Sequence, residues 1–290
     1  MRTQEEMYRL FHSIAREDTR ILAMYLNGSR TNENAPVDIF QDYDLVYVVS
    51  ETAPFREDRT WIGRFGTVLY MQYPDEHPTL PSDKENFYGW LMQFDDGVRV
   101  DLHVESVAHA LANIRRDSLC TVLLDKQGIL PPLPPASDRS HWVQKPTEAE
   151  FLACCNEFWW CTNNLAKGLW REEMPYVQDM ANCVVRKELE RMLSWKIGIG
   201  KDFRVSVGKS GKYFSRFLSE AEYRQYLDTY FGGQTEAAWD AVMTMCGLFT
   251  QTSAWVSNRL NYALDAEEAA RAQAFLAHVR QLPRDAKEIY

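Results

Sequence analysis

Two aspartates, one residue apart, begin an apolar stretch in the first fifth of the chain. The stretch reads QDYDLVYVV, and the aspartates are Asp42 and Asp44. Residues i and i+2 of a β-strand project from the same face, so a strand here would place both carboxylates side by side. Adjacent carboxylates repel each other unless a cation lies between them, and Mg²⁺ prefers such oxygen ligands. The pair therefore predicts a magnesium site, although an edge strand with two solvated aspartates would have the same sequence.

A short polar turn precedes this pair and indicates what the site would bind. It reads NGSR and contains Gly28, Ser29 and Arg30. Glycine permits close approach of the backbone to a ligand, and the serine hydroxyl and arginine guanidinium are donors suited to phosphate oxygens. Such a turn shortly before paired carboxylates predicts a site for a phosphate-bearing substrate together with its metal.

A third carboxylate appears in a later alternating segment, DGVRVDLHVES. Its apolar positions, Val98, Val100, Leu102 and Val104, would form one face of a strand, and Arg99, Asp101 and His103 the other. On a neighbouring strand, Asp101 would complete a cluster with Asp42 and Asp44. Three carboxylates can hold two cations that clamp the attacking and the leaving oxygen of a displacement reaction.

The elements that must position these residues are visible as apolar stretches bounded by turn residues. Stretches with strand character cover Ile21–Leu26, Leu45–Val49, Thr67–Tyr73 and Val98–Val104, and helical spacing marks the beginning of the chain and Ala108–Asp117. We therefore predict an α/β (α+β) domain over residues 1–135, with a mixed β-sheet flanked by helices.

The second half of the chain has the periodicity of helices rather than of strands. Four prolines in ILPPLPPASDRS precede it, and because proline cannot donate to a helix or a sheet, we predict a linker over residues 136–146. Thr147 with Glu150 three residues later matches a helical capping box. Further amphipathic helices are expected near Val177–Lys196, Glu220–Tyr230, Glu236–Asn261 and Ala266–Arg280. Residues 147–290 thus predict a helical-bundle domain.

Composition excludes several classes of protein. The 290 residues carry a formal net charge of −9, and a polynucleotide-binding surface is normally basic, so we expect no nucleic-acid partner. No apolar run is long enough to span a membrane. The six cysteines form no CxxC pair, which is typical of free thiols in a reducing cytoplasm. An acidic protein also suits a cationic small substrate.

The order of these motifs resembles a known superfamily. Gly-Ser, a short loop, Asp-x-Asp and a later strand aspartate resemble the polymerase-β-like nucleotidyltransferases. The longer strings NGSRTNENAPVDIFQDYDLVYVV and DGVRVDLHV, with LAKGLWREEMPY and SVGKSGKYF, resemble the aminoglycoside 6-adenylyltransferases that inactivate streptomycin. This similarity covers nearly the whole chain.

The resemblance implies an enzyme that transfers AMP from ATP, with Mg²⁺, to a hydroxyl at position 6 of streptomycin, releases pyrophosphate and confers resistance. It also implies that Ser29 and Arg30 contact the triphosphate and that Asp42 and Asp44 hold the metals. Asp101 would be a metal ligand, the general base, or both, and a carboxylate of the helical domain is the alternative base. We expect a cytoplasmic monomer.

Further contacts are expected from the second domain. Lys209 and Lys212, on a glycine-rich segment, would provide cations for the β- and γ-phosphates, unless they are two solvated lysines. Aromatic rings and carboxylates suit a cationic sugar, because guanidinium groups stack on rings and pair with acids. The segment WREEMPYVQDM provides both, and we predict drug contacts at Trp170, Glu172, Glu173 and Asp179.

Two rival interpretations stay open at this point. The first is a nucleotidyltransferase with another acceptor, such as a different aminoglycoside, a protein side chain or an RNA end, although the acidic balance disfavours RNA. The second is a non-catalytic nucleotide-binding or drug-binding regulatory protein. The second rival is disfavoured because a site without catalysis has no need for clustered carboxylates.

Overall fold

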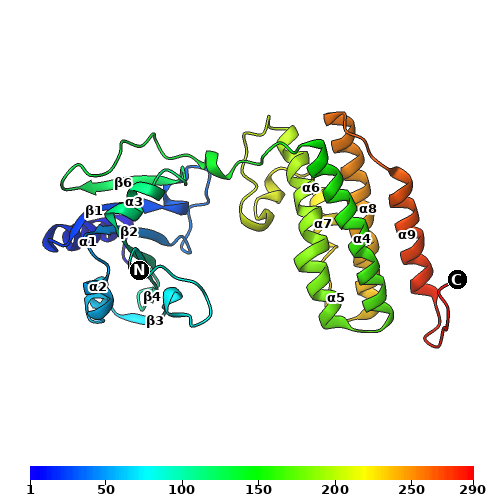
Figure 1. The fold of residues 1–290 in the computed structure, drawn as a ribbon, viewed down its shortest axis with the longest axis horizontal. Helices are drawn as coiled ribbons and strands as arrows, with labels where there is room; N and C mark the ends of the chain where they lie inside the picture. The colour runs from blue at the N-terminus through cyan, green and yellow to red at the C-terminus, as the bar shows by residue number, and fades with distance from the viewer. The chain divides into compact units, whose positions relative to one another are not determined.

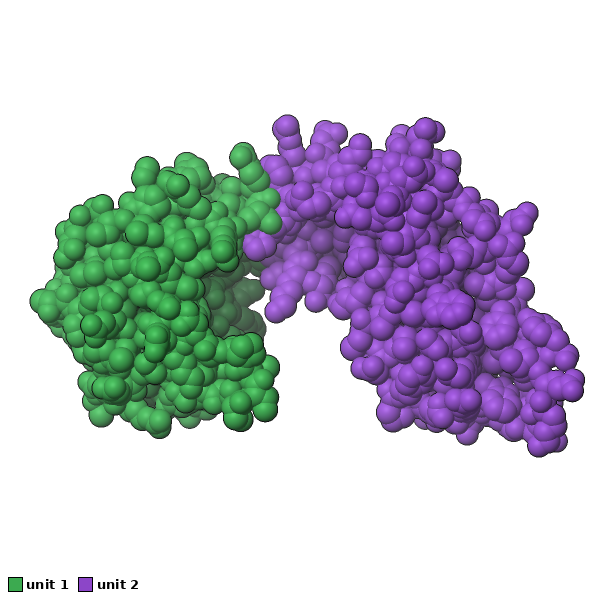
Figure 2. Space-filling model, in the orientation of Figure 1, with its two compact units in different colours: residues 1–140 green, residues 141–290 purple.

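The computed structural model describes residues 1–290, which form two compact units, residues 1–140 and 141–290 (Figure 1, Figure 2). The division lies within the proline-bounded segment that the sequence predicts as a linker. Each unit has its own hydrophobic core and is described by itself.

Unit 1 is built on one six-stranded sheet with the order β3-β4-β5-β2-β1-β6 (Figure 1). The strands are β1 (Ile21–Asn27), β2 (Tyr43–Val49), β3 (Val68–Gln72), β4 (Phe87–Phe94), β5 (Arg99–Ser106) and β6 (Cys120–Asp125). β2 and β5 run parallel, whereas all other neighbours are antiparallel. The predicted mixed sheet is therefore confirmed.

The two faces of this sheet are covered differently. On one face, α1 (Gln4–Glu17) buries Met7, Phe11 and Ile14 against the main core, which also takes in the short helix α2 (Ala53–Glu57) through Phe55. On the other face, α3 (Val107–Asn113) packs a smaller cluster around Ala110. That cluster takes in residues of β1, β2, β6, α3 and the segment after β6, and none of β3, β4 or β5, so it covers part of the second face.

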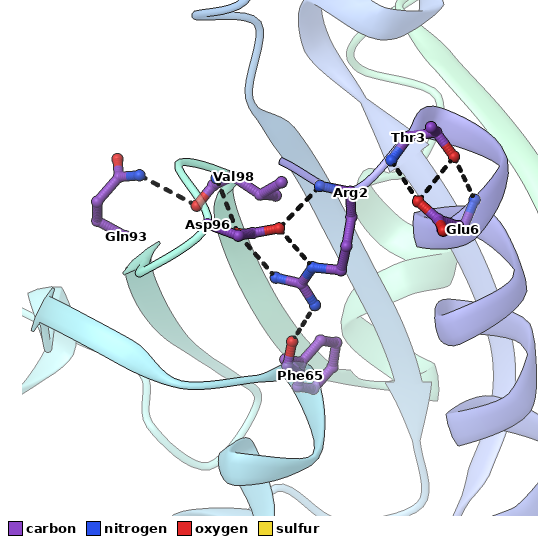
Figure 3. Close-up of polar contacts among 7 residues, drawn as sticks. All are labelled: Arg2, Thr3, Glu6, Phe65, Gln93, Asp96 and Val98. Carbon is purple, nitrogen blue, oxygen red and sulfur yellow. Dashed lines mark hydrogen bonds and ion pairs between the residues drawn. The ribbon is translucent and has the colours of Figure 1, made fainter.

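The N-terminal residues are fastened to the β4–β5 hairpin (Figure 3). The Arg2 backbone N–H donates to Asp96 at 2.8 Å and its Nε donates to the same carboxylate at 2.9 Å, while another guanidinium nitrogen donates to the carbonyl of Phe65. Thr3 then caps α1 in a reciprocal capping box with Glu6. These contacts fix the start of α1 relative to the sheet.

Three details differ from the pattern that the sequence analysis used. β4 and β6 are additional strands; in β4 the apolar residues Phe87 and Leu91 occupy the face opposite the core, which hides the alternation of Tyr88, Trp90 and Met92. β2 begins at Tyr43, so Asp42 precedes the strand.

Unit 2 is helical, as predicted. Its helices are α4 (Glu148–Trp170), α5 (Met174–Met180), α6 (Arg186–Ile199), α7 (Glu220–Leu227), α8 (Thr235–Leu260) and α9 (Ala266–Gln281). A π-helical segment, Ala181–Val185, joins α5 to α6. The capping box of Thr147 and Glu150 opens α4 as expected. The core of unit 2 links α4 to α8 through Phe158 and Phe249, whose stacked rings have centroids 3.7 Å apart. None of the helices in the chain is both long and apolar enough to cross a membrane.

Candidate active site

The three aspartates singled out from the sequence lie together in unit 1. One carboxylate oxygen from each of Asp42, Asp44 and Asp101 lies within 4.8 Å of those of the other two. Asp44 and Asp101 are direct partners in the parallel pairing of β2 with β5, and Asp42 stands one residue before β2. Asp44 and Asp101 are 57 positions apart in the chain, and the register between β2 and β5 makes them neighbours.

The sequence around the cluster explains why the carboxylates share one face. Tyr43 and Leu45 are 2% and 0% exposed and belong to the main core. Because strand side chains alternate, burying these two residues turns Asp42 and Asp44 to the opposite face. On β5, Val100 and Leu102 are buried in the same core, which places Asp101 on the face that carries the other two carboxylates.

The cluster has an unfavourable charge balance in the metal-free protein. Burial, followed by the negative charges of Asp42 and Asp101, raises the pKa of Asp44 to about 7. Asp101 is itself only 9% exposed. A buried carboxyl beside two others gains stability from any cation that reaches it.

Arg99 provides part of that positive charge. Its Nε and Nη2 donate to the two carboxylate oxygens of Asp101 at 2.8 and 2.6 Å, and its Nε lies 3.8 Å from Asp42. Hydrogen bonding to Asp101 raises the pKa of the Arg99 guanidinium above its ordinary value. The i, i+2 spacing of the two residues predicts Arg99 on the face of Asp101, but the sequence alone assigns Arg99 no role.

The glycine of the polar turn packs directly against the cluster. Gly28 has a φ of +71°, and a β-carbon at this position would lie 2.0 Å from Oδ2 of Asp44. Only glycine combines this backbone conformation with so close an approach. The turn therefore borders the carboxylates, as a phosphate held by both would require.

Ser29 and Arg30 have different surroundings within this turn. The Ser29 hydroxyl is buried and has no hydrogen-bond partner, a rare state for a polar atom that a ligand oxygen would relieve. Arg30 is already engaged: its Nε and Nη2 donate to the carbonyls of Asp42 and Gln41 at 2.8 and 2.6 Å, and its guanidinium stacks on the Tyr43 ring at 3.6 Å. In this structure Arg30 holds the backbone that carries Asp42.

A cavity of about 490 Å³ lies beside the turn. Ser29, Arg30 and Gln41 line it, and the rest of its wall comes from Gln4, Thr31, Asn32, Glu33, Val37, Thr121, Pro135 and Ala136. The three aspartates are not part of its wall. The turn thus borders both this cavity, through Ser29 and Arg30, and the carboxylate cluster, through Gly28.

The two lysines predicted to bind phosphate lie in unit 2, on a loop with unusual backbone conformations. Gly208, Ser210 and Gly211 have φ values of +71°, +54° and +68°. Lys209 and Lys212 are both exposed, and Nζ of Lys212 lies 5.2 Å from the centre of the Tyr213 ring. The loop presents both cations to solvent.

The residues predicted to contact the drug also lie in unit 2 and have other partners. Trp170 packs on the core, and its Nε1 donates to the carbonyl of Leu282 at 3.2 Å. Glu172 pairs with Arg284, and Glu173 lies 4.0 Å from Arg171. Asp179 is exposed on α5, and its carboxylate raises the pKa of the Cys183 thiol above its ordinary value. Three of these residues therefore expose carboxylates, whereas Trp170 is partly occupied in packing.

The arrangement in unit 1 fits a divalent cation by its donor chemistry. Three close carboxylates, one with a raised pKa, form the hard oxygen set that Mg²⁺ prefers, and the unpartnered Ser29 hydroxyl adds a donor for a phosphate. Asp42, Asp44 and Asp101 would hold the metal. Such a site can neutralise charge in a phosphoryl-transfer or nucleotidyl-transfer reaction.

Comparisons with known proteins agree along almost the full length of the chain. The family model described as streptomycin adenylyltransferase matches residues 1–279. The chain is 37% identical over 265 residues to the aminoglycoside 6-adenylyltransferase of Bacillus subtilis (strain 168), covering 90% of this chain and 93% of that relative. The proteins of the same name from Staphylococcus aureus and Campylobacter jejuni are 34% and 36% identical, and each alignment covers 90% of this chain.

One solved structure also aligns with the chain. The crystal structure of an aminoglycoside 6-adenyltransferase from Bacillus subtilis matches 97% of this chain and 100% of its own, with 30% identity and a TM-score of 0.48.

Proposed function

Since the chain belongs to the streptomycin adenylyltransferase family and is an adenylyltransferase, we propose that it transfers AMP from Mg²⁺-ATP to the 6-hydroxyl of streptomycin. The observation that carries the proposal is the convergence of Asp42, Asp44 and Asp101 beside the Gly28–Arg30 turn. Modification of this hydroxyl would make the protein an antibiotic-resistance enzyme. We also propose a cytoplasmic location and a monomeric state.

In unit 1, some residues bind the nucleotide and others hold the metal that offsets the negative charge of its phosphates. The Ser29 hydroxyl donates to an oxygen of the triphosphate, and Gly28 lets the backbone approach it. Arg30 holds the carbonyls of Gln41 and Asp42 and so fixes the first metal-binding carboxylate. When bound by the three aspartates, magnesium supplies the positive charge that offsets the charge of the reacting phosphates.

Asp101 is the proposed general base. The acceptor hydroxyl gives its proton to a carboxylate oxygen of Asp101 while its own oxygen forms the new bond to the α-phosphorus. The bond from the α-phosphorus to the bridging oxygen breaks, and pyrophosphate leaves with that oxygen. Both oxygens of Asp101 accept hydrogen bonds from Arg99 here, so Arg99 must move aside, and it is then free to pair with a phosphate.

Unit 2 contributes the remaining proposed contacts. Exposed Lys209 and Lys212 would pair with the β- and γ-phosphates. The carboxylates of Glu172, Glu173 and Asp179 would bind the cationic groups of the drug, with Trp170 as a partly exposed ring beside them. A carboxylate of this unit is also the alternative to Asp101 as base.

The proposal is tested by incubating the protein with ATP, Mg²⁺ and streptomycin and measuring the mass of the drug. We expect a product heavier by one AMP group, formed together with pyrophosphate, whose attachment to the 6-oxygen is established by NMR. The variant Asp101→Asn should give no product while keeping the circular dichroism spectrum of the parent. A panel of other aminoglycosides run in parallel shows whether another molecule is the acceptor. The absence of pyrophosphate release with every aminoglycoside would contradict the proposal.

A further inference from the structure

The edge strand β3 contains an irregularity that turns two apolar side chains away from the core. Val68 pairs with Phe94, whereas Tyr70 pairs with Gln93, so Leu69 and Tyr70 together oppose one residue of β4. This is a β-bulge, a device that re-aims side chains and is common beside active sites. Val68 and Met71 pack on the main core, while Leu69 and Tyr70 are 61% and 70% exposed.

Strand register connects these side chains to the carboxylate cluster. Asp44 pairs with Asp101, Asp101 with Leu91, and Leu91 with Gln72, which gives one row across β2, β5, β4 and β3. In the next row, Arg99 pairs with Gln93 and Gln93 with Tyr70. Tyr88, Trp90, Met92 and Phe94 of β4 are buried in the main core, so Leu91 and Gln93 project from the face that carries Asp101.

These residues form a continuous surface, which we call the sheet platform: Leu69, Tyr70, Gln72, Leu91 and Gln93. It offers a phenol ring, two leucines and two side-chain amides and contains no charged group. Arg99 and Asp101 border it along β5. Neighbouring strands lie about 5 Å apart, so Tyr70 on β3 stands about 10 Å from the strand that carries Asp101.

We infer that the sheet platform binds a ring of the acceptor, a polyhydroxylated and cationic sugar-like molecule, and orients its hydroxyl toward Asp101. The inference rests on the proposed function. Amides can pair with ring hydroxyls, and the faces of Tyr70 and Leu91 can cover the apolar face of a sugar-like ring. The platform offers no carboxylate, so the cationic groups of the acceptor would pair with the carboxylates already proposed for them, Glu172, Glu173 and Asp179.

The order of strands decides between the acceptor and the nucleotide as occupant. The Gly28–Arg30 turn follows β1, on one side of the carboxylates, and the platform lies on β4 and β3, on the other side. In nucleotidyl transfer the attacking and leaving oxygens lie roughly in line through the phosphorus. With the leaving pyrophosphate at the turn, the attacking hydroxyl approaches from the side of the platform.

The test compares the steady-state kinetics of matched variants of the full chain with ATP, Mg²⁺ and the aminoglycoside that the parent modifies. Tyr70→Ala removes the ring, and Tyr70→Phe keeps it. Leu69→Ala is paired with Leu111→Ala, which truncates another exposed leucine, 48% exposed on α3. Because Tyr70 and Leu69 are mainly exposed, their truncation should leave the melting temperature nearly unchanged.

We expect Tyr70→Ala to raise the KM for the acceptor about tenfold, and Leu69→Ala to raise it by a smaller factor. The KM for ATP should stay within about twofold of the parent value, and Tyr70→Phe and Leu111→Ala should behave as the parent does. A rise confined to the KM for ATP would assign the platform to the nucleotide and overturn the inference. Unchanged kinetics in Tyr70→Ala would also overturn it.

Failure of the proposed function gives a different result from failure of the platform. If the parent protein transfers AMP to no aminoglycoside, the proposed function is wrong and the inference is withdrawn with it. If the parent is active and Tyr70→Ala matches it in every constant, only the platform is wrong. A calorimetric titration of the ATP-free protein with the acceptor gives an independent readout, in which Tyr70→Ala should weaken binding and Tyr70→Phe should not.

Discussion

Gly28 and Asp44 are packed so closely that a β-carbon on residue 28 would lie 2.0 Å from Oδ2 of Asp44. The turn that follows β1 and the carboxylate of β2 therefore fit together only because residue 28 is glycine. Asn27 and Asp44 are direct partners in the β1–β2 pairing, so the contact is set by sheet register. A change at residue 28 would reach the carboxylate directly.

Gly28→Ala should accordingly abolish AMP transfer, because the new methyl group must displace Asp44 from the cluster. The positive φ adds a strain of about 1–2 kcal/mol to the folded state. Gly128→Ala is the matched control, since Gly128 has a φ of +65° and no atom within 4 Å of the added β-carbon. Both variants should lose stability in urea unfolding, Gly28→Ala the more because its methyl group meets Asp44, and only Gly28→Ala should lose activity. Equal activity in the two variants would contradict the role of the close contact.

Asp44→Asn should make the metal-free protein more stable near neutral pH. Burial and the charges of Asp42 and Asp101 raise the pKa of Asp44 to about 7, above its ordinary value of 3.8. The stabilising contribution of the protonated group is present below the ordinary pKa and is lost as the pH rises through about 7. In EDTA, the free energy of unfolding of the variant should therefore exceed that of the parent by on the order of 2 kcal/mol at about pH 8, and by less than half as much at about pH 5.

Magnesium provides the control for this comparison. An excess of Mg²⁺ at about pH 8 should stabilise the parent through binding to the folded state and should stabilise Asp44→Asn much less. Urea unfolding monitored by tryptophan fluorescence gives all six free energies, for the parent and the variant in EDTA at the two pH values and in Mg²⁺ at about pH 8. A variant that is less stable than the parent in EDTA at both pH values would show that Asp44 is not under electrostatic strain.

Particular residues show how far the sequence could predict this site. The alternation of side chains was enough to predict that Asp42 and Asp44 share one face of the sheet. Tyr43 and Leu45 are apolar, and their burial in the core turns the two aspartates to the opposite face. The juxtaposition of Asp44 with Asp101 depends on the parallel pairing of β2 with β5, which a single sequence does not reveal. The alternation of the later segment therefore predicted the cluster only on the condition that Asp101 lies on a neighbouring strand, and the pairing of β2 with β5 meets that condition.

Other features escaped prediction for local reasons. β4 carries apolar residues on both faces, so its period of two was hidden. The bulge at Leu69 left no mark in the sequence, since both residues of the bulge are apolar like those of an ordinary strand. The engagement of Arg30 with the carbonyls of Gln41 and Asp42 depends on loop geometry that residue types do not fix.

Asp96→Asn should loosen the N-terminal attachment shown in Figure 3. Burial alone would raise the pKa of Asp96, but hydrogen bonds from Arg2 and from the N–H of Val98 hold it well below its ordinary value. The stabilising contribution of this carboxylate is present above the ordinary pKa and is lost as the pH falls through the lower folded value. At neutral pH the substitution should lower the free energy of unfolding by about 1.5–3 kcal/mol.

The neighbouring residue provides a control for this effect. Asp95 is exposed on the same hairpin, and Asp95→Asn removes the same charge. Chemical unfolding of both variants at neutral pH should show a loss of stability only in Asp96→Asn. A similar loss in Asp95→Asn would mean that net charge, rather than the contacts with Arg2, is responsible.

Lys209→Ala and Lys212→Ala should each raise the KM for ATP about tenfold, because each would remove one cation from the terminal phosphates. The KM for the acceptor should change little. Lys201→Ala is the control, since Lys201 is another exposed lysine of the same unit, beyond the end of α6. Kinetic constants equal to those of Lys201→Ala would identify Lys209 and Lys212 as ordinary solvated side chains.

The most direct test of the account is whether the three carboxylates bind a divalent cation together with a nucleotide. Electron paramagnetic resonance can count the Mn²⁺ ions that the protein takes up in the presence of an ATP analogue that cannot release pyrophosphate. We predict that the parent binds Mn²⁺ tightly and that Asp42→Asn, Asp44→Asn and Asp101→Asn each weaken this binding severely without unfolding the protein. Binding that is unchanged in all three variants would contradict the account.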